Sequence, residues 1–228
     1  MSLRNLLVIA AIPCALVAQA PAGPPDLLPA SATAQLARSF EVATTHTSHV
    51  WRDTSALNSD GSVNAYIEIS RGDRRKWEFD MRLNARAIDR VMPEDLGGYP
   101  VNYGFVPQTV SYDGDPFDAL VLGPPARAGR LMAGAIVGLM FMEDEKGLDS
   151  KVVLSRTGGD ARPIHELTTE VQREIGDYFR RYKLHEPGAF SRVPGWGSAA
   201  QGLAHVSRTG AFFRECRRRA GVPCRLGQ

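Results

Sequence analysis

Short apolar segments separated by turn residues fill the chain between residues 63 and 154. Their length and their content of β-branched and aromatic residues are typical of β-strands. Glycine, proline and aspartate lie between them, as in Arg71-Gly72-Asp73 and Gly123-Pro124-Pro125, and such clusters mark turns. The expected strands cover residues 63–69, 76–81, 87–92, 103–106, 119–122, 131–142 and 151–154. Many short strands with this punctuation predict a small β-barrel.

Two helices are expected after the strands, over residues 165–182 and 198–219. In the first, apolar residues recur every three or four positions, which gives a single apolar face. In the second, Leu203, Val206 and Phe213 are expected on the buried side. Residues 195–200 also fit the dinucleotide-binding pattern G-x-G-x-x-A, but no convincing strand precedes them. We therefore interpret Ser198 as the N-cap of a helix.

The N-terminal residues have the pattern of a secretory signal peptide. Arg4 precedes an apolar run over residues 6–17, and Ala-x-Ala sequences end at Ala20 and Ala22. We expect a signal peptide over residues 1–22 and an exported protein, periplasmic or secreted; an uncleaved anchor is the alternative. Residues 23–45 are expected to be a linker with one short helix over 31–40. Residues 46–228 would then form the globular domain and a C-terminal tail.

Charge and cysteine content limit the partners of this chain. The formal net charge is +2, which argues against nonspecific binding of nucleic acid, because that requires a strong basic excess. Outside the signal segment, two of the three cysteines remain, Cys216 and Cys224. In an oxidising compartment such a pair suggests a disulfide, although two free thiols are the alternative.

Two acidic clusters are the strongest chemical feature. Asp113, Asp115 and Asp118 lie within six residues at a turn between expected strands, and Asp144, Glu145 and Asp149 follow the long strand. Carboxylates this close repel one another unless a cation neutralises them. Solvated acidic turns are the alternative interpretation. The spacing excludes an EF-hand, and the all-oxygen donors favour magnesium, manganese or calcium.

Basic and phenolic residues accompany these clusters. Lys76 and Glu78 are two residues apart, so they share one face of an expected strand. Arg90 ends another strand, while Tyr182 and Lys183 end the first expected helix. Together with the carboxylates, these groups would suit a metal-bound polyanion.

The sequence resembles the family I soluble inorganic pyrophosphatases from about Val50 to Arg219. The similarity is carried by Lys76-Trp77-Glu78, by Tyr99-Pro100-Val101-Asn102-Tyr103-Gly104 and by the D-G-D-P-x-D signature at Asp113 to Asp118. Ser70 and Trp77 depart from the usual proline and tyrosine of that family.

The resemblance implies an α+β fold with a mainly β core, an OB-like small closed barrel flanked by two C-terminal helices. It makes Asp115 the general base, and it implies Mg²⁺ as the cofactor, with Mn²⁺ as a substitute. The implied metal ligands are Asp113, Asp118, Asp144 and Asp149. The implied substrate-binding residues are Lys76, Arg90, Tyr103, Tyr182 and Lys183. Residues implied to contribute indirectly or through water are Glu68, Glu78, Tyr99 and Lys151.

The implied activity is hydrolysis of pyrophosphate, and the implied assembly is a homo-oligomer. After removal of the signal peptide we expect no stable insertion into a membrane. One alternative is a hydrolase of other phosphoanhydrides, polyphosphate or nucleotides, although the sequence has no Walker P-loop. The other is a non-enzymatic OB-type binding module, which would need aromatic platforms in a basic groove rather than carboxylates.

Overall fold

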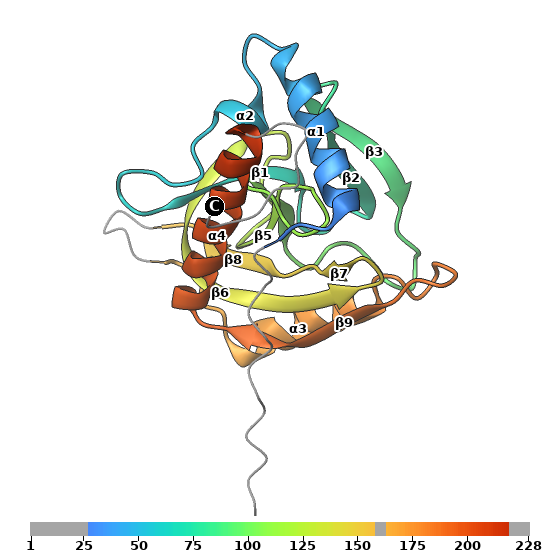
Figure 1. Cartoon of the computed structure of the whole chain (residues 1–228). Coiled ribbons are helices and arrows are strands. Elements are labelled where there is room, and N and C mark those ends of the chain that lie inside the picture. Colours follow the sequence, from blue (N-terminus) through green and yellow to red (C-terminus); the bar gives the residue numbers. More distant parts are fainter. Residues whose placement is uncertain (1–26, 158–162, 219–228) are drawn as a thin grey trace, which may run out of the picture.

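A closed ring of five strands forms the centre of the computed structural model, which describes residues 27–157 and 163–218 (Figure 1). The ring runs from β1 (Val63–Ile69) to β4 (Asn102–Val106), β5 (Phe117–Leu122), β8 (Lys151–Ser155) and β6 (Leu131–Asp144). It closes because β1 pairs with both β4 and β6. The β5–β8 pair is parallel and the other pairs of the ring are antiparallel. This arrangement confirms the expected OB-like architecture.

The long strand β6 makes the closure possible. Its start pairs with β1, its middle with β8, and its far half with β9 (Ser191–Gly197) and the short β7 (Gly147–Leu148). The register shifts near Gly138 and Met142, and irregularities of this kind bend a strand and increase its twist. One strand can therefore serve two sides of the barrel.

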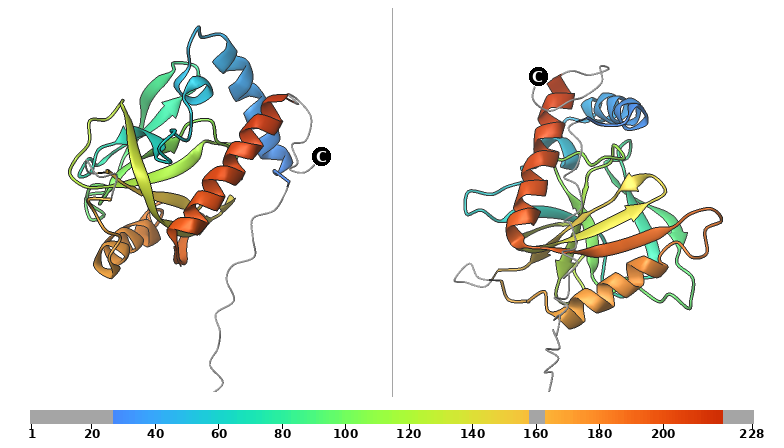
Figure 2. Two further views of the ribbon diagram at one scale, coloured as in Figure 1. Left: turned by 90° about the vertical axis from the view of Figure 1, so that its left-hand side faces the viewer. Right: turned by 60° about the horizontal axis from the view of Figure 1, so that its bottom comes forward.

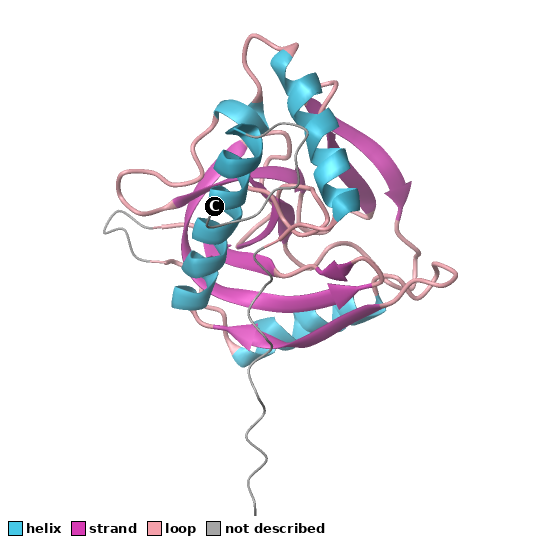
Figure 3. Ribbon diagram, viewed as in Figure 1, coloured by secondary structure: helices cyan, strands magenta, loops and turns pink. Residues whose placement is uncertain are grey.

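Two strands and one short helix lie beside the ring (Figure 3). The strands β2 (Arg75–Asp80) and β3 (Ala85–Val91) form a separate antiparallel hairpin. A single helical turn, α2 (Val50–Asp53), buries Trp51 completely. No residue of either hairpin strand is fully buried; all are exposed or partly exposed.

Two helices pack on the barrel after the last ring strand. In α3 (Thr169–Arg181) the Thr168 hydroxyl accepts a hydrogen bond from the Val171 amide, as an N-cap does. In α4 (Ala199–Arg218) Ser198 and Gln201 form a reciprocal capping box. Gly202 lets α4 approach β6 closely, since an added Cβ would lie 2.8 Å from the Gly138 carbonyl oxygen. Val206 and Phe213 are buried as expected, whereas Leu203 is 45% exposed, so that assignment was wrong.

The N-terminal segment folds onto the domain, contrary to the expected linker. Helix α1 (Ala30–Thr44) extends beyond the expected 31–40 at both ends. It buries Leu36 and Phe40 in a cluster with Trp51 and Phe213, on the side of the barrel that also carries α4 (Figure 2). Residues 1–22, which include the expected signal peptide, lie outside the described residues, and so does Cys224.

The strand expectations were correct in position, with two omissions. All seven expected strands are present with ends shifted by two residues at most, but β7 and β9 were not predicted. Strand β9 ends at Gly197, so a strand does lead into the G-x-G-x-x-A pattern of residues 195–200 and includes its first three residues. It pairs with β6 in antiparallel fashion rather than within a βαβ unit, which argues against a dinucleotide-binding turn.

Candidate active site

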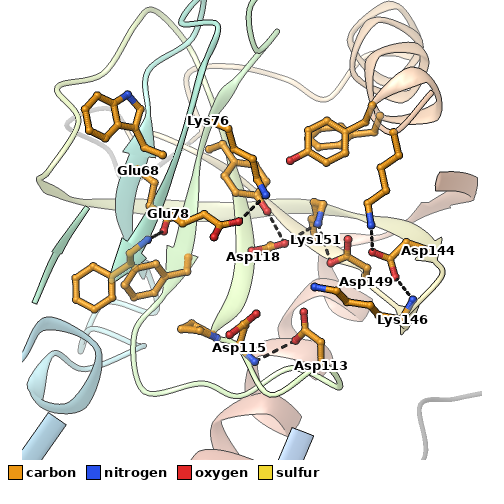
Figure 4. A pocket seen from close by; sticks show the side chains of 18 of the residues that line it. Glu68, Lys76, Glu78, Asp113, Asp115, Asp118, Asp144, Lys146, Asp149 and Lys151 are labelled. Atoms are coloured by element: carbon orange, nitrogen blue, oxygen red, sulfur yellow. Dashed lines mark hydrogen bonds and ion pairs between the residues drawn. The ribbon is translucent and has the colours of Figure 1, made fainter. Parts of the chain in front are cut away.

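A polar cavity of about 180 Å³ opens between the barrel, the β2–β3 hairpin and the end of α3 (Figure 4). Its walls bring together side chains from six parts of the sequence. All but two of the site residues predicted from sequence line it, and the exceptions, Arg90 and Tyr99, lie beside it. The predicted residues that line it are Glu68, Lys76, Glu78, Tyr103, Asp113, Asp115, Asp118, Asp144, Asp149, Lys151, Tyr182 and Lys183.

The turn before β5 presents two carboxylates to this cavity. The Ser111 amide donates to the Asp115 carbonyl at 2.7 Å, and the Gly114 amide donates to the Ser111 carbonyl at 3.1 Å. Oδ1 of Asp113 accepts a hydrogen bond from the Asp115 amide at 3.1 Å. Gly114 has a φ of +92°, a left-handed conformation that glycine adopts without steric cost. The turn therefore places Asp113 and Asp115 on one wall.

Asp118, at the start of β5, is held by a buried cation and a phenol. The Lys151 ammonium lies 2.5 Å from Oδ2 of Asp118 and 2.8 Å from Oδ1 of Asp149. The Tyr103 hydroxyl donates to the same Asp118 oxygen at 2.6 Å. Lys151 is 2% exposed, so these carboxylates replace most of its hydration. The three strands β4, β5 and β8 thereby share one charged cluster.

The opposite end of the cavity joins β6 to α3. The Lys183 ammonium lies 2.7 Å from Oδ2 of Asp144 and 2.7 Å from Oε1 of Glu145. Oδ1 of Asp144 accepts the Lys146 amide at 2.8 Å, so this carboxylate caps the tight turn that leads into β7. Lys183 and Asp144 are both buried, which makes this ion pair an integral part of the wall.

The β2–β3 hairpin contributes a third set of charges. The Lys76 ammonium lies 2.5 Å from Oε1 of Glu78 and 3.2 Å from Oδ2 of Asp89. Glu68, on β1, is buried and accepts the backbone amide of Phe79 at 2.6 Å. Burial raises the pKa of Glu68 well above its usual value, and repulsion from Asp118 raises it further. Glu68 thus fastens the hairpin to the barrel.

The two predicted residues outside the cavity contact its wall from behind. The Tyr99 hydroxyl lies 3.1 Å from the Tyr182 hydroxyl, and Tyr99 is 1% exposed. The Arg90 guanidinium lies 5.9 Å from the centre of the Tyr182 ring and 2.5 Å from Oε1 of Glu186. Tyr99 therefore supports Tyr182 from behind, and Arg90 is turned toward Glu186 beside the same ring.

The cavity carries an excess of negative charge. Seven carboxylate residues face four lysines along its lining. Burial, with repulsion from neighbouring carboxylates, raises the pKa of Asp113 to about 7, and burial with repulsion from Asp118 does the same for Asp149. Loss of hydration and repulsion from Asp118 raise the pKa of Asp115 to about 6. Each raised pKa means that ionising these carboxylates together is unfavourable unless more positive charge is present.

The charge and the donor atoms of this cavity both suit divalent cations. The donors are carboxylate oxygens, which hard cations such as Mg²⁺ prefer. Within residues 27–157 and 163–218, however, no three acidic, histidine or cysteine side chains already converge as a metal cage. Lysine ammonium groups hold Asp118, Asp144 and Asp149 instead. Metal binding would require these carboxylates to turn away from the lysines.

Two residues of this region were not predicted from sequence. Lys146 lines the cavity, and its charge lowers the pKa of Asp115. Its position between Asp144 and Asp149 in one turn was a usable signal. Gln35, on α1, donates to Oδ1 of Asp115 at 2.6 Å, and nothing in the sequence around it pointed to the site.

Fold and site together define an OB-like barrel with a small polar cavity lined by carboxylates and lysines. The family model described as Inorganic pyrophosphatase matches residues 65–213, and the chain belongs to that family. It is 39% identical to the inorganic pyrophosphatase of Thermus thermophilus over 152 residues, which make up 63% of this chain and 86% of that protein. It is 33% identical to that of Saccharolobus solfataricus over 153 residues, 64% of this chain and 88% of that protein.

Solved structures give the same result. The inorganic pyrophosphatase of Coxiella burnetii superposes with a TM-score of 0.65 at 36% identity, covering 70% of this chain and 99% of that one. The Thermus thermophilus structure gives a TM-score of 0.66 at 34% identity, covering 72% and 99%. The resemblance derived from the sequence motifs is confirmed.

Proposed function

We propose that this protein hydrolyses inorganic pyrophosphate to two orthophosphate ions in a magnesium-dependent reaction. The observation that carries the proposal is the cavity of Figure 4, which carboxylates and lysines line together in a chain of the inorganic pyrophosphatase family. Carboxylates alone would repel an anion, and lysines alone would need no metal. The combination suits a polyanion that arrives with divalent cations.

The residues would divide this work by position. Asp113, Asp118, Asp144 and Asp149 would hold the metal, which supplies positive charge against the repulsion between nucleophile and substrate. Asp115 lines the cavity on the turn beside these ligands, so its carboxylate can accept the proton of the attacking water. A pKa raised toward neutrality is favourable for a general base, because such a group binds the proton more tightly when it takes it.

The cations and phenols would bind the phosphate oxygens. Lys76 and Lys183 both line the cavity; Lys183 is paired with Asp144, a proposed metal ligand, and Lys76 is paired with Glu78 and Asp89. Tyr103 and Tyr182 can donate hydroxyl hydrogen bonds from the wall of the cavity. Burial keeps both phenols protonated, since it raises the pKa of each. Charge-assisted bonds of this kind hold the anion where charge develops in the reaction.

The size of the cavity favours pyrophosphate over larger phosphoanhydrides as the substrate. A volume of about 180 Å³ is below the roughly 300 Å³ at which pockets for drug-sized ligands begin. A nucleotide would have to leave its base and sugar in solvent. The deciding experiment measures phosphate release from pyrophosphate, tripolyphosphate and ATP, each with Mg²⁺, with Mn²⁺ and with a chelator. Equal rates on ATP and pyrophosphate would contradict the proposal, and so would unchanged rates in the chelator.

We further propose export to the periplasm or medium, on the signal-like pattern of residues 1–22. The described residues contain no helix that is long and apolar enough to cross a membrane. Cys216 is buried and disulfide-bonded, which suits an oxidising compartment. The proposed partner is Cys224. Terminal sequencing and mass spectrometry of the native protein test both points; an intact Met1 or two free thiols would contradict them.

We also propose that the protein works as a homo-oligomer, because the family resemblance implies one. Sedimentation of the purified protein would test this directly. A single monomeric species across the working concentration range would contradict it.

A further inference from the structure

Helix α1 lies against the turn that carries Asp113 and Asp115. It spans Ala30–Thr44, wholly outside the segment matched by the family model, residues 65–213. Its Gln35 amide nitrogen lies 2.6 Å from Oδ1 of Asp115, a separation of 80 residues along the chain. An amide nitrogen facing a carboxylate oxygen at this distance is a charge-assisted hydrogen bond.

The backbones of the helix and the turn also touch. A Cβ added to Gly114 would lie 2.8 Å from the carbonyl oxygen of Ala32, so only glycine fits between turn and helix. Gly114 also has a positive φ, and both requirements fall on one residue. The contact between α1 and the turn therefore does not depend on a single flexible side chain.

Buried side chains fix the rotation of α1 about its axis. Leu36 is 2% exposed and Phe40 is 6% exposed. The ring of Phe40 lies 4.8 Å from that of Trp51 and 5.4 Å from that of Phe213. With this face anchored, Gln35 is held on the side that meets the turn. Its position is set by core packing rather than by its own contact.

We propose that Gln35 is a positioning residue for Asp115, and this inference rests on the function proposed above. The torsion that orients a carboxylate is soft and nearly two-fold, so the Asp115 carboxylate would change orientation easily without this hydrogen bond. The hydrogen bond holds Oδ1 and leaves Oδ2 to accept a proton. Because the amide is neutral, it orients this carboxylate without adding charge to a cavity that must bind both cations and an anion.

The test replaces Gln35 by methionine, which keeps the length of the side chain and removes the donor. At saturating Mg²⁺ and pyrophosphate, Gln35→Met should lower kcat about threefold to tenfold, the loss expected for one partly exposed hydrogen bond to a charged group. KM should stay unchanged, and the unfolding midpoint should fall only slightly, by the loss of this one hydrogen bond, so that the protein stays fully folded in the assay. The matched control is Arg38→Met, an exposed position on the same helix, which should keep the parental kcat. An unchanged or raised kcat in Gln35→Met would overturn the inference, as would a loss of kcat that the lost fraction of folded protein accounts for.

A second measurement does not depend on turnover. A double-mutant cycle combines Gln35→Met with Asp115→Ala and measures urea unfolding of all four proteins in a chelator. Residues in direct contact give non-additive effects, so coupling supports the inference and strict additivity overturns it. A parent protein that released no phosphate from pyrophosphate would instead overturn the proposed function, and the cycle would still decide whether Gln35 holds Asp115.

Discussion

The Lys151 ammonium lies between Asp118 and Asp149, 2.5 Å from the first carboxylate and 2.8 Å from the second. Both carboxylates are proposed metal ligands, and the lysine is almost fully buried. This one cation pairs with both carboxylates and offsets part of their negative charge. Lys151 and a divalent metal are therefore alternative partners for the same oxygens, which connects the stability of the fold to occupation of the site.

Replacing Lys151 by methionine should destabilise the metal-free protein strongly. Removal of one partner from a buried ionic cluster typically costs about 3–5 kcal/mol, because the remaining charge is left uncompensated. Saturating Mg²⁺ should recover much of this loss, since the metal would replace the missing charge. Urea unfolding in chelator and in Mg²⁺ measures both values.

The control for this variant is Lys146→Met, which removes an exposed lysine from the rim of the same cavity. Its free energy of unfolding should stay close to that of the parent protein. If the two lysine variants lost equal stability in chelator, the buried pairing of Lys151 would not be the cause.

The metal-free protein should lose stability as the pH rises from about 4 to about 7. Asp113 and Asp149 each have a pKa of about 7 in the fold against 3.8 in the unfolded chain, so the folded state binds protons more tightly in that range. Stability is thus greatest below this window and lower above it. With Mg²⁺ present the decline should disappear, because the cation stabilises the ionised form.

Thermal unfolding between pH 4 and pH 8, in chelator and in Mg²⁺, measures this difference. His49 and His205 have lowered pKa values, so they disfavour the fold as the pH falls below 6.5. They contribute to both series alike, and the difference between the series isolates the carboxylates. Two superimposable series would show that these carboxylates do not bind the metal.

Most of the barrel was predictable because its information is local. Each ring strand is a short apolar run bounded by turn residues, and β1 was predicted with its observed ends at Val63 and Ile69. Strand β9 was missed because Ser191–Gly197 contains a proline and two glycines, residues depleted in strands. It exists through its pairing with β6, which is a tertiary contact.

The site also contains residues that a local pattern predicts and a residue that only a tertiary contact brings in. Asp113, Asp115 and Asp118 are close in sequence, so their meeting in space follows from one turn. Gln35 joins them only because Leu36 and Phe40 dock α1 beside that turn. No local pattern encodes that docking, and a segment rich in alanine and threonine is compatible with a linker as well as with a helix.

Arg90→Ala should lower kcat/KM by about 10-fold to 100-fold with little change in stability. The expected cause is loss of a bidentate contact to phosphate, worth roughly the hydrogen bonds that a charged group makes. Arg90→Lys should recover little, because lysine lacks the planar fork. Steady-state kinetics with unfolding curves separate the two effects.

Glu186→Ala provides the matched control for Arg90. The Glu186 carboxylate holds the Arg90 guanidinium, so its removal should leave Arg90 free to bind phosphate and activity should persist. If Glu186→Ala lost as much activity as Arg90→Ala, the ion pair itself would matter, and Arg90 would act through the structure rather than on the substrate.

Asp115→Asn and Asp118→Asn should fail in different ways. Asparagine keeps the shape of aspartate but accepts no proton, so Asp115→Asn should lose about 10²–10⁴-fold in kcat and keep its affinity for Mg²⁺. Asp118 is a proposed ligand that also accepts hydrogen bonds from Lys151 and Tyr103, so Asp118→Asn should lose metal affinity together with activity. High Mg²⁺ should therefore recover Asp118→Asn in part and leave Asp115→Asn unchanged. Titrating Mg²⁺ into both variants while measuring phosphate release distinguishes them. Near-normal turnover of Asp115→Asn at saturating Mg²⁺ would remove Asp115 from the role of base and leave the metal alone to activate the water.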